Sequence, residues 1–234
     1  MNSVRDMHFG ILARLTDQKG ISYLLDALKQ YRDKHGDIHF TFAGQGDREE
    51  MIREFVDSNH LSNVRIVRVS GVPTVSPSSP ASIASIASRA SRVSCVSRVS
   101  CVSPVSPGSS ASIASRVSRV SPASSVLGSF DVFVHPSLDD AMPMSIAEAL
   151  MCGVPCIVCN VGGCADLVRD GVEGFVIEPR RADLIFDRMD RMARMGEEEF
   201  QGFQRRARAR YEEVCLPAKV GAVVAEHYRA VMGR

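Results

Sequence analysis

Residues 130–159 read FDVFVHPSLDDAMPMSIAEALMCGVPCIVC, and this stretch decides the fold class. Its two short apolar runs, Phe130–Val134 and Cys156–Cys159, are typical of buried strands. Between them, Ser145–Met151 places apolar side chains at helical spacing, and a glycine follows two residues later. A strand, a helix and a second strand in this order predict two parallel strands joined by a crossover helix.

The same alternation continues on both sides of this unit. Apolar runs predict strands over 9–15, 38–42, 64–69 and 174–177, and amphipathic segments predict helices over 20–33, 51–56 and 164–169, with two or three more over 182–233. We therefore predict an α/β fold, a Rossmann-like parallel sheet with helices on both faces. Ligands of such sheets bind at the carboxyl ends of the strands, where loops lead into helix N-termini.

A serine repeat interrupts the pattern. From Ser76 to Ser124 a serine occupies every third position, 17 times in succession. Residues 72–125 carry few large apolar side chains, and a period of three fits neither a helix face nor a strand face, so we predict disorder. The Arg-X-Ser triplets are compatible with kinase sites, but an expanded DNA repeat or a retained intron is the interpretation we favour. The predicted lobe then comprises residues 1–71 and 126–234.

Composition excludes few functions. The net charge of +1 gives no reason to expect nucleic acid or an anionic membrane as a partner, and no apolar run reaches the about 20 residues of a membrane helix. Seven scattered cysteines fit a reducing compartment, so we expect a cytoplasmic location. Cys152, Cys156 and Cys159 have the spacing of iron–sulfur ligands. We expect packing instead, because a strand would point the last two to opposite faces.

Two cations lie in the loop between the first strand and the first helix. Arg14 and Lys19 are five residues apart, in the segment Arg14–Gly20. A guanidinium fork and a point charge suit a diphosphate. On these residues alone, two solvated surface cations are the simpler interpretation.

Two carboxylates bracket the start of the helix over 145–151. Asp140 precedes it, Glu148 lies about a turn inside it, and Met144, Ser145 and Ile146 can present free backbone N–H groups there. The start of a helix attracts anions through unpaired donors and its dipole. The carboxylates can accept hydrogen bonds from sugar hydroxyls on either side of a phosphate. Taken alone, Glu148 reads as a surface glutamate.

Paired glycines form a third feature. Gly44 and Gly46 follow the strand over 38–42, and Gly162 and Gly163 follow the strand over 156–159. Glycine lets the backbone approach a ligand or a neighbouring strand closely. Because Gly44-Gln45-Gly46 lacks a third glycine, it is not a dinucleotide fingerprint.

Together these motifs resemble a known family. Residues 9–71 and 126–180 resemble the C-terminal lobe of retaining glycosyltransferases of family 4, which have the GT-B fold. The resemblance is carried by Arg-Leu-X-X-X-Lys-Gly at 14–20 and by an acid-X7-Glu pattern from Asp140 to Glu148. Cys152–Val158, then Val161-Gly162-Gly163 and Asp170-Gly171, continue it in register.

The resemblance assigns roles. A nucleotide-diphosphate sugar would be the donor and a hexose-type sugar would be transferred with retention, with no metal and no cofactor. Arg14 and Lys19 would bind the diphosphate, Asp140 the transferred sugar and Glu148 the ribose. The catalytic residues would be Asp140, Arg14 and Lys19, and the donor-binding residues Glu148, Pro143, Met144, Ser145, Gly44, Gly46 and Gly71.

Departures from the family leave alternatives open. Ala13 replaces the usual glycine, Asp140 replaces the commoner glutamate, and the acceptor-binding N-terminal lobe is absent. We therefore expect no sugar transfer unless an acceptor-binding lobe or subunit, encoded either separately or upstream, completes the enzyme. The alternatives are a non-catalytic truncated or mis-spliced remnant that at most binds a nucleotide, and another GT-B enzyme such as a nucleotide-sugar epimerase. The acid-X7-Glu pattern argues against the epimerase.

Overall fold

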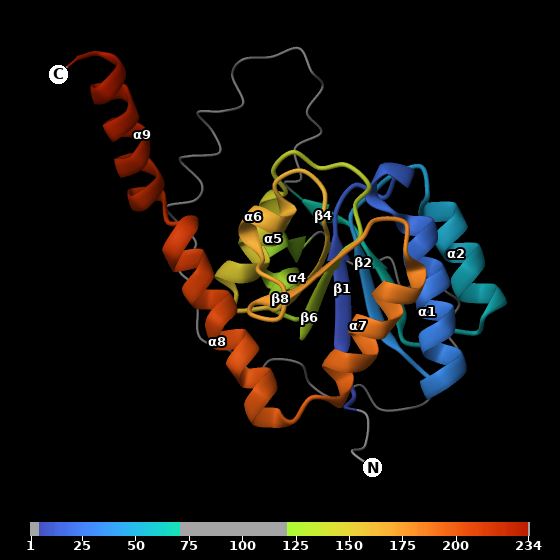
Figure 1. Ribbon diagram of the computed structural model, residues 1–234. Helices are drawn as coiled ribbons and strands as arrows, with labels where there is room; N and C mark the ends of the chain where they lie inside the picture. Colours follow the sequence, from blue (N-terminus) through green and yellow to red (C-terminus); the bar gives the residue numbers. More distant parts are fainter. Residues whose placement is uncertain (1–4, 71–120, 234) are drawn as a thin grey trace.

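The computed structural model describes residues 5–70 and 121–233 (Figure 1). The main sheet contains β1 (His8–Leu12), β2 (His39–Ala43), β3 (Val64–Val67), β6 (Val132–His135), β7 (Cys156–Cys159) and β8 (Gly174–Ile177). A small second sheet pairs β4 (Val69–Ser70) with β5 (Ser121–Pro122). The helices are η1 (Asp17–Lys19), α1 (Ile21–His35), α2 (Glu49–Ser58), α4 (Ala123–Leu127), α5 (Met144–Met151), α6 (Cys164–Leu167), α7 (Ala182–Arg194), α8 (Glu197–Val214) and α9 (Pro217–Val231).

Gly71 and most of the predicted serine repeat, residues 71–120, lie outside the described residues. The description resumes at Ser121, in β5, and α4 begins at Ala123. Five residues that we assigned to the repeat therefore lie in described elements.

The six strands of the main sheet are parallel and run in the order β3-β2-β1-β6-β7-β8. The prediction of a Rossmann-like parallel sheet is confirmed. The chain builds outward from β1 to β3, then returns to the other side of β1 and builds outward again. The carboxyl ends of β1 and β6 therefore meet at a topological switch point, where open α/β sheets bind their ligands.

Helices cover both faces of the sheet (Figure 1). One buried apolar cluster joins α1, α2 and α7 to the sheet, and a second joins α4, α5 and α6 to the opposite face. Side chains along a strand alternate between the two clusters, because successive side chains of a strand point to opposite faces. In β7, Cys159 belongs to the first cluster and Cys156 to the second, which confirms their predicted opposite orientation.

Several predicted boundaries were wrong by a few residues. The first strand ends at Leu12 rather than 15, because the chain turns there: Ala13 N–H bonds to the carbonyl of Ala43 at the end of β2, and Leu15 N–H bonds to that of Gln45 in the loop after it. The helix predicted over 164–169 ends at Leu167, since Val168 adopts an extended conformation with φ −121° and ψ 122°. The strand predicted over 64–69 is divided between β3 and β4.

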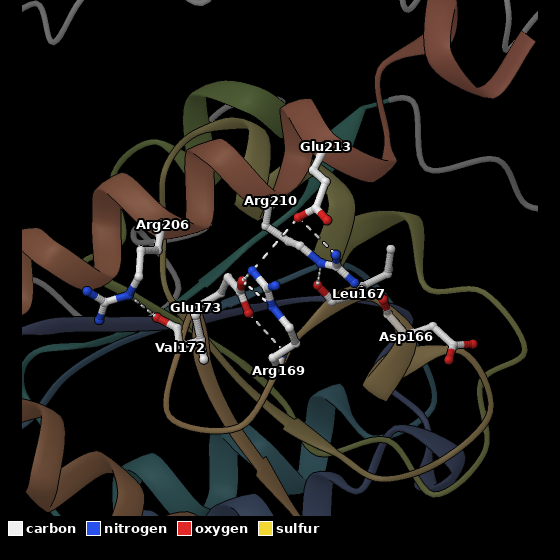
Figure 2. A network of polar contacts seen from close by, with 8 residues as sticks. All are labelled: Asp166, Leu167, Arg169, Val172, Glu173, Arg206, Arg210 and Glu213. Carbon is white, nitrogen blue, oxygen red and sulfur yellow. Dashed lines mark hydrogen bonds and ion pairs between the residues drawn. The ribbon is translucent and has the colours of Figure 1, made fainter. Parts of the chain in front are cut away.

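Arginines of α8 donate hydrogen bonds to the segment between β7 and β8 and so hold the helix against it (Figure 2). Arg210 donates to the carbonyl oxygens of Asp166 at 2.7 Å and Leu167 at 3.2 Å. Arg206 donates to the carbonyl oxygen of Val172 at 2.8 Å. These arginines therefore serve packing of the lobe and are engaged by backbone carbonyls.

A buried carboxylate lies beneath the same contacts (Figure 2). Glu173 is fully buried and accepts hydrogen bonds from the backbone N–H of Arg169 at 2.9 Å and from its Nε at 2.8 Å. Glu213 of α8 pairs with Arg169 at 3.8 Å and with Arg210 at 3.1 Å. The buried charge is thus compensated by a neighbour four residues away, which in turn contacts α8.

Helix α9 extends away from the rest of the lobe (Figure 1). Its exposed apolar side chains include Val223 and Tyr228. No helix in the described part of the chain combines the length and the apolar character needed to cross a membrane.

Candidate functional site

A cleft of about 360 Å³ opens at the carboxyl ends of β1 and β6, the switch point of the sheet. Seven of the ten predicted site residues line it: Arg14, Lys19, Asp140, Pro143, Met144, Ser145 and Glu148. The remaining lining residues are Leu12, Ala13, Ala123, His135 and Met142. The structure therefore brings together the two cations, the helix start and the two carboxylates that the sequence singled out.

The loop that carries the two cations is held by backbone contacts on both of its sides. Leu15 N–H donates to the Gln45 carbonyl at 2.9 Å, and the Leu15 carbonyl accepts from Arg48 N–H at 3.0 Å. At its end, Gly20 has a φ of 69°, and a Cβ there would lie 2.0 Å from the Pro136 carbonyl oxygen. Only glycine fits this position, so the loop that ends at Gly20 lies directly against the loop that carries Asp140.

Gly44 and Gly46, which we predicted to contact the donor, are not among the residues that line the cleft. A Cβ on Gly44 would lie 1.8 Å from the Ala13 carbonyl oxygen, and one on Gly46 would lie 2.1 Å from that of Leu15. The close approach that these glycines allow is made by a neighbouring loop. They support the Arg14 loop from behind.

The second glycine pair, Gly162 and Gly163, also supports the site from outside. Gly162 has a φ of 48°, and a Cβ there would lie 1.9 Å from the carbonyl oxygen of Asp140. Gly163 N–H donates to the Ala141 carbonyl at 3.0 Å. The turn after β7 therefore packs against the backbone of the Asp140 loop, which fixes that loop at the edge of the cleft.

Asp140 is the most heavily engaged side chain of the cleft. Its Oδ2 lies 2.5 Å from Lys19 Nζ and 3.0 Å from His135 Nε2. These contacts hold the pKa of Asp140 at about 2, with the hydrogen bond from His135 as the largest cause and the pairing with Lys19 adding to it against the opposing effect of burial. Asp140 is therefore a carboxylate at neutral pH.

His135 is the last residue of β6 and is 1% exposed. Burial lowers its pKa, so the ring is neutral at neutral pH. Because Asp140 is ionised, the neutral ring must carry its proton on Nε2 to donate the observed hydrogen bond. The opposite nitrogen, Nδ1, is buried without a partner in the described part of the chain. The sequence gave no signal of its contact with Asp140.

The start of α5 forms the floor of the cleft. The helix begins at Met144, after Pro143 in an extended conformation. We predicted a free N–H group at Ile146, but this group donates to the Pro143 carbonyl at 3.1 Å and is therefore not available to a ligand. The N–H groups of Met144 and Ser145 belong to the first turn, where a helix has no internal acceptors.

Arg14 and Glu148 are the two charged groups of the cleft whose side chains have no partner in the part of the chain that the structure describes. Arg14 is exposed and Glu148 is half-buried, and neither side chain has a hydrogen-bond or ion-pair partner within residues 5–70 and 121–233. Burial raises the pKa of Glu148 above its ordinary value. The Arg14 guanidinium can therefore donate hydrogen bonds to a ligand, and the Glu148 carboxylate can accept them.

The described residues contain no group of three or more His, Cys, Asp or Glu side chains arranged to hold a metal ion. Burial raises the pKa of Cys156 far above its ordinary value and that of Cys159 to about 12. Both thiols therefore stay protonated and behave as small apolar side chains.

Comparison with known proteins points to one group of enzymes. Residues 117–210 match the family model described as glycosyl transferases group 1. Over 68 residues the chain is 41% identical to the UDP-Gal:alpha-D-GlcNAc-diphosphoundecaprenol alpha-1,3-galactosyltransferase of Escherichia coli. That alignment covers 29% of this chain and only 18% of the Escherichia coli enzyme.

Solved structures share the fold. The pneumococcal O-GlcNAc transferase GtfA, in complex with UDP and GlcNAc, superposes with a TM-score of 0.66 at 12% identity, over 99% of this chain and 37% of that one. The C-terminal domain of a glycosyl transferase group 1 family protein (LpcC) from Francisella tularensis superposes with a TM-score of 0.58 at 13% identity, over 90% and 87% of the two chains. The chain thus has the fold of the C-terminal lobe of GT-B glycosyltransferases, as its motifs predicted.

Proposed function

We propose, from the similarity of this chain to the C-terminal lobe of GT-B glycosyltransferases, that it binds a nucleotide-diphosphate sugar as the donor lobe of a retaining family 4 hexosyltransferase. The observation that supports this most strongly is the composition of the switch-point cleft. Two cations, a helix start and two carboxylates line one space of about 360 Å³. That combination matches a ligand that has a diphosphate at its centre and hydroxyl groups on both sides.

The diphosphate would lie between Arg14, Lys19 and the first turn of α5. Arg14 presents a guanidinium without a partner in the described part of the chain, and the N–H groups of Met144 and Ser145 lie at the positive end of the helix dipole. During transfer, the bond between the anomeric carbon of the sugar and the diphosphate oxygen breaks, and negative charge grows on the leaving diphosphate. These donors stabilise that charge, so the proposal requires neither a metal ion nor another cofactor.

The two carboxylates would recognise the hydroxyls. Glu148 is half-buried without a side-chain partner among the described residues, and burial raises its pKa because the charged form is poorly solvated there. Ribose hydroxyls would supply the missing hydrogen-bond donors. Asp140 would receive a hydroxyl of the transferred sugar on the oxygen that Lys19 and His135 do not use.

Transfer further requires an acceptor. We propose that an acceptor-binding lobe, on the same polypeptide or on a partner, completes the active site, and that the enzyme acts in the cytoplasm without nucleic acid. The chain of residues 1–234 alone is expected to bind donor and to transfer no sugar. Turnover of a UDP-sugar with a panel of simple acceptors by this chain alone would contradict that part of the proposal.

Donor binding can be measured by isothermal titration calorimetry with UDP, ADP, GDP and UDP-glucose. At least one of these nucleotides should bind, and Glu148→Ala should weaken its binding by about tenfold to a hundredfold, the loss of a hydrogen bond to a charged group. Glu54→Ala is a matched control, because Glu54 is an exposed glutamate of α2 outside the cleft. If no nucleotide binds, or if both variants behave alike, the assignment of the cleft is wrong, and the truncated remnant becomes the better description.

A further inference from the structure

One of the two cations assigned to the diphosphate already has a partner. Lys19 Nζ lies 2.5 Å from Asp140 Oδ2, and their side chains are only 13% and 15% exposed. Arg14, by contrast, is exposed and has no partner within the described residues. Without ligand, the positive charge of Lys19 is therefore neutralised inside the cleft, and only Arg14 offers an uncompensated cation.

The acidic partner is held firmly in place. His135 donates to the same oxygen of Asp140 at 3.0 Å, and its ring is buried at the end of β6 and stacked on Phe133. The backbone of Asp140 is in turn packed against Gly162. Asp140 cannot follow Lys19 if the lysine moves, so a shift of Lys19 toward a diphosphate leaves the carboxylate short of one partner.

A bare diphosphate and a diphosphate sugar meet this pair differently. A bare diphosphate that draws Lys19 away leaves an uncompensated carboxylate a few ångströms from its own negative charges, and such like charges repel. A sugar attached to the diphosphate brings hydroxyl donors to the same carboxylate and replaces the lost ammonium. The geometry therefore favours the ligand that still carries its sugar.

We propose that Lys19 exchanges between Asp140 and the diphosphate, and that Asp140 thereby makes the cleft discriminate against a nucleoside diphosphate without its sugar. This inference rests on the proposed function. It gives Asp140 a second role beside sugar contact: after transfer, when the sugar hydroxyls have left, the carboxylate recovers Lys19 and weakens the hold on the diphosphate. Asp140 is thus a specificity-determining residue that promotes product release.

Calorimetric titrations with inorganic pyrophosphate and with UDP test the exchange, since pyrophosphate carries no base and no sugar. Asp140→Asn should bind both probes about tenfold more tightly than the wild-type chain, a change of about 1.4 kcal/mol. The preference for UDP-glucose over UDP should fall at the same time. Asp139→Asn is the matched control, because it removes the same charge from the adjacent, exposed residue outside the cleft and should leave all affinities within about twofold.

Two further variants separate the exchange from a general charge effect. In a Lys19→Met background, Asp140→Asn should change pyrophosphate affinity less than it does in the wild-type chain, because the pair no longer exists. In the wild-type background, Arg14→Met should weaken pyrophosphate binding more than Lys19→Met does, since only Lys19 is neutralised beforehand. This second comparison does not depend on the folding of any Asp140 variant.

The outcomes are distinct. The exchange is overturned if Asp140→Asn binds pyrophosphate and UDP no more tightly than the wild-type chain does. The proposed function still stands in that case, provided that Glu148→Ala shows the expected loss of nucleotide affinity. Equal losses in Arg14→Met and Lys19→Met would also overturn the exchange. Absence of binding to pyrophosphate and to every nucleotide by the wild-type chain would refute the proposed function and the exchange with it.

Discussion

Gly44→Ala probes how tightly the loop that carries Arg14 is held against the end of β2. Gly44 has a φ of +143°, a conformation that side chains rarely adopt, and a Cβ there would lie 1.8 Å from the Ala13 carbonyl oxygen. Real Cβ atoms essentially never approach other atoms closer than 3.0 Å, so one of the two loops must shift by more than an ångström. Ala13 and Arg14 line the cleft, so the shift reaches the site.

Substitutions at two other glycines separate the effects of backbone strain and of crowding on the free energy of unfolding. Gly36 has a φ of +88° with nothing within 4 Å of its would-be Cβ, so Gly36→Ala measures backbone strain alone. That strain costs about 1–2 kcal/mol, offset in part by the lower entropy of the unfolded chain. Gly46 has no positive φ but would place its Cβ 2.1 Å from the Leu15 carbonyl oxygen, so Gly46→Ala measures crowding alone, about 1–3 kcal/mol. Gly44→Ala combines both, and we expect a loss of about 2–5 kcal/mol in the free energy of unfolding.

Urea denaturation followed by far-UV circular dichroism gives these three free energies. We expect the order Gly36→Ala, Gly46→Ala, Gly44→Ala from least to most destabilised, with pyrophosphate binding weakened only in the two variants whose crowding displaces the Arg14 loop. If Gly44→Ala is no less stable than Gly36→Ala, the two loops do not lie against each other as described, and our account of how Arg14 is positioned is wrong.

Three further predictions concern buried and paired charges. Burial raises the pKa of Glu148, so the stability tied to its protonated form is present below its unfolded pKa and is lost as the pH rises through the raised folded value. Glu148→Gln should therefore be more stable than the wild-type chain at pH 7, by less than about 1 kcal/mol, and urea titrations should show the gap closing near pH 4. The pH dependence expected for Asp140 is the reverse, because its pKa is lowered from an ordinary 3.8 to about 2. The stability that its ionised form contributes is present above pH 3.8 and is lost as the pH falls through about 2. The advantage of the wild-type chain over Asp140→Asn, about 1 kcal/mol after solvent screening, should shrink between pH 4 and pH 2, and a constant gap would argue against the pairing. Finally, Arg169→Met leaves the buried Glu173 without its guanidinium and should cost about 2–3 kcal/mol at pH 7, whereas Arg205→Met, an exposed arginine of α8, should cost under about 0.5 kcal/mol. Equal thermal stabilities of those two variants would mean that the buried carboxylate does not depend on Arg169.

The fold was predictable because the sheet is buried on both faces. Strands such as Cys156–Cys159 are apolar throughout, and the helices between them bury one stripe each, so the order of elements could be inferred from the pattern of apolar residues alone. The ends of elements were less predictable. Where β1 ends depends on the end of β2 and the loop after it, which accept hydrogen bonds from Ala13 and Leu15, and no local pattern encodes such a contact.

The site was predictable as a set of motifs and unpredictable as a set of contacts. Arg14, Lys19, Asp140 and Glu148 were found because parallel strands bring their carboxyl ends together. The contact of Gly44 with the Ala13 loop could not be predicted, because a glycine that allows close approach has the same sequence signature whether a ligand or another loop approaches it. The contact of His135 with Asp140 could not be predicted, since it depends on how the loop after β6 folds back.

The pairing of Lys19 with Asp140 shows why residue type alone does not determine the charge that a cleft presents. Counting motifs gives two cations for a diphosphate, yet one of them is neutralised 2.5 Å away by the carboxylate assigned to the sugar. If the cleft binds a diphosphate as we propose, its affinity would be a difference between two states of Lys19 and would depend on whether another group satisfies Asp140. In that proposal, a sugar that is still attached does so, and a product that has lost its sugar does not. The same four side chains would then bind a donor and release its product without any movement of the sheet that carries them.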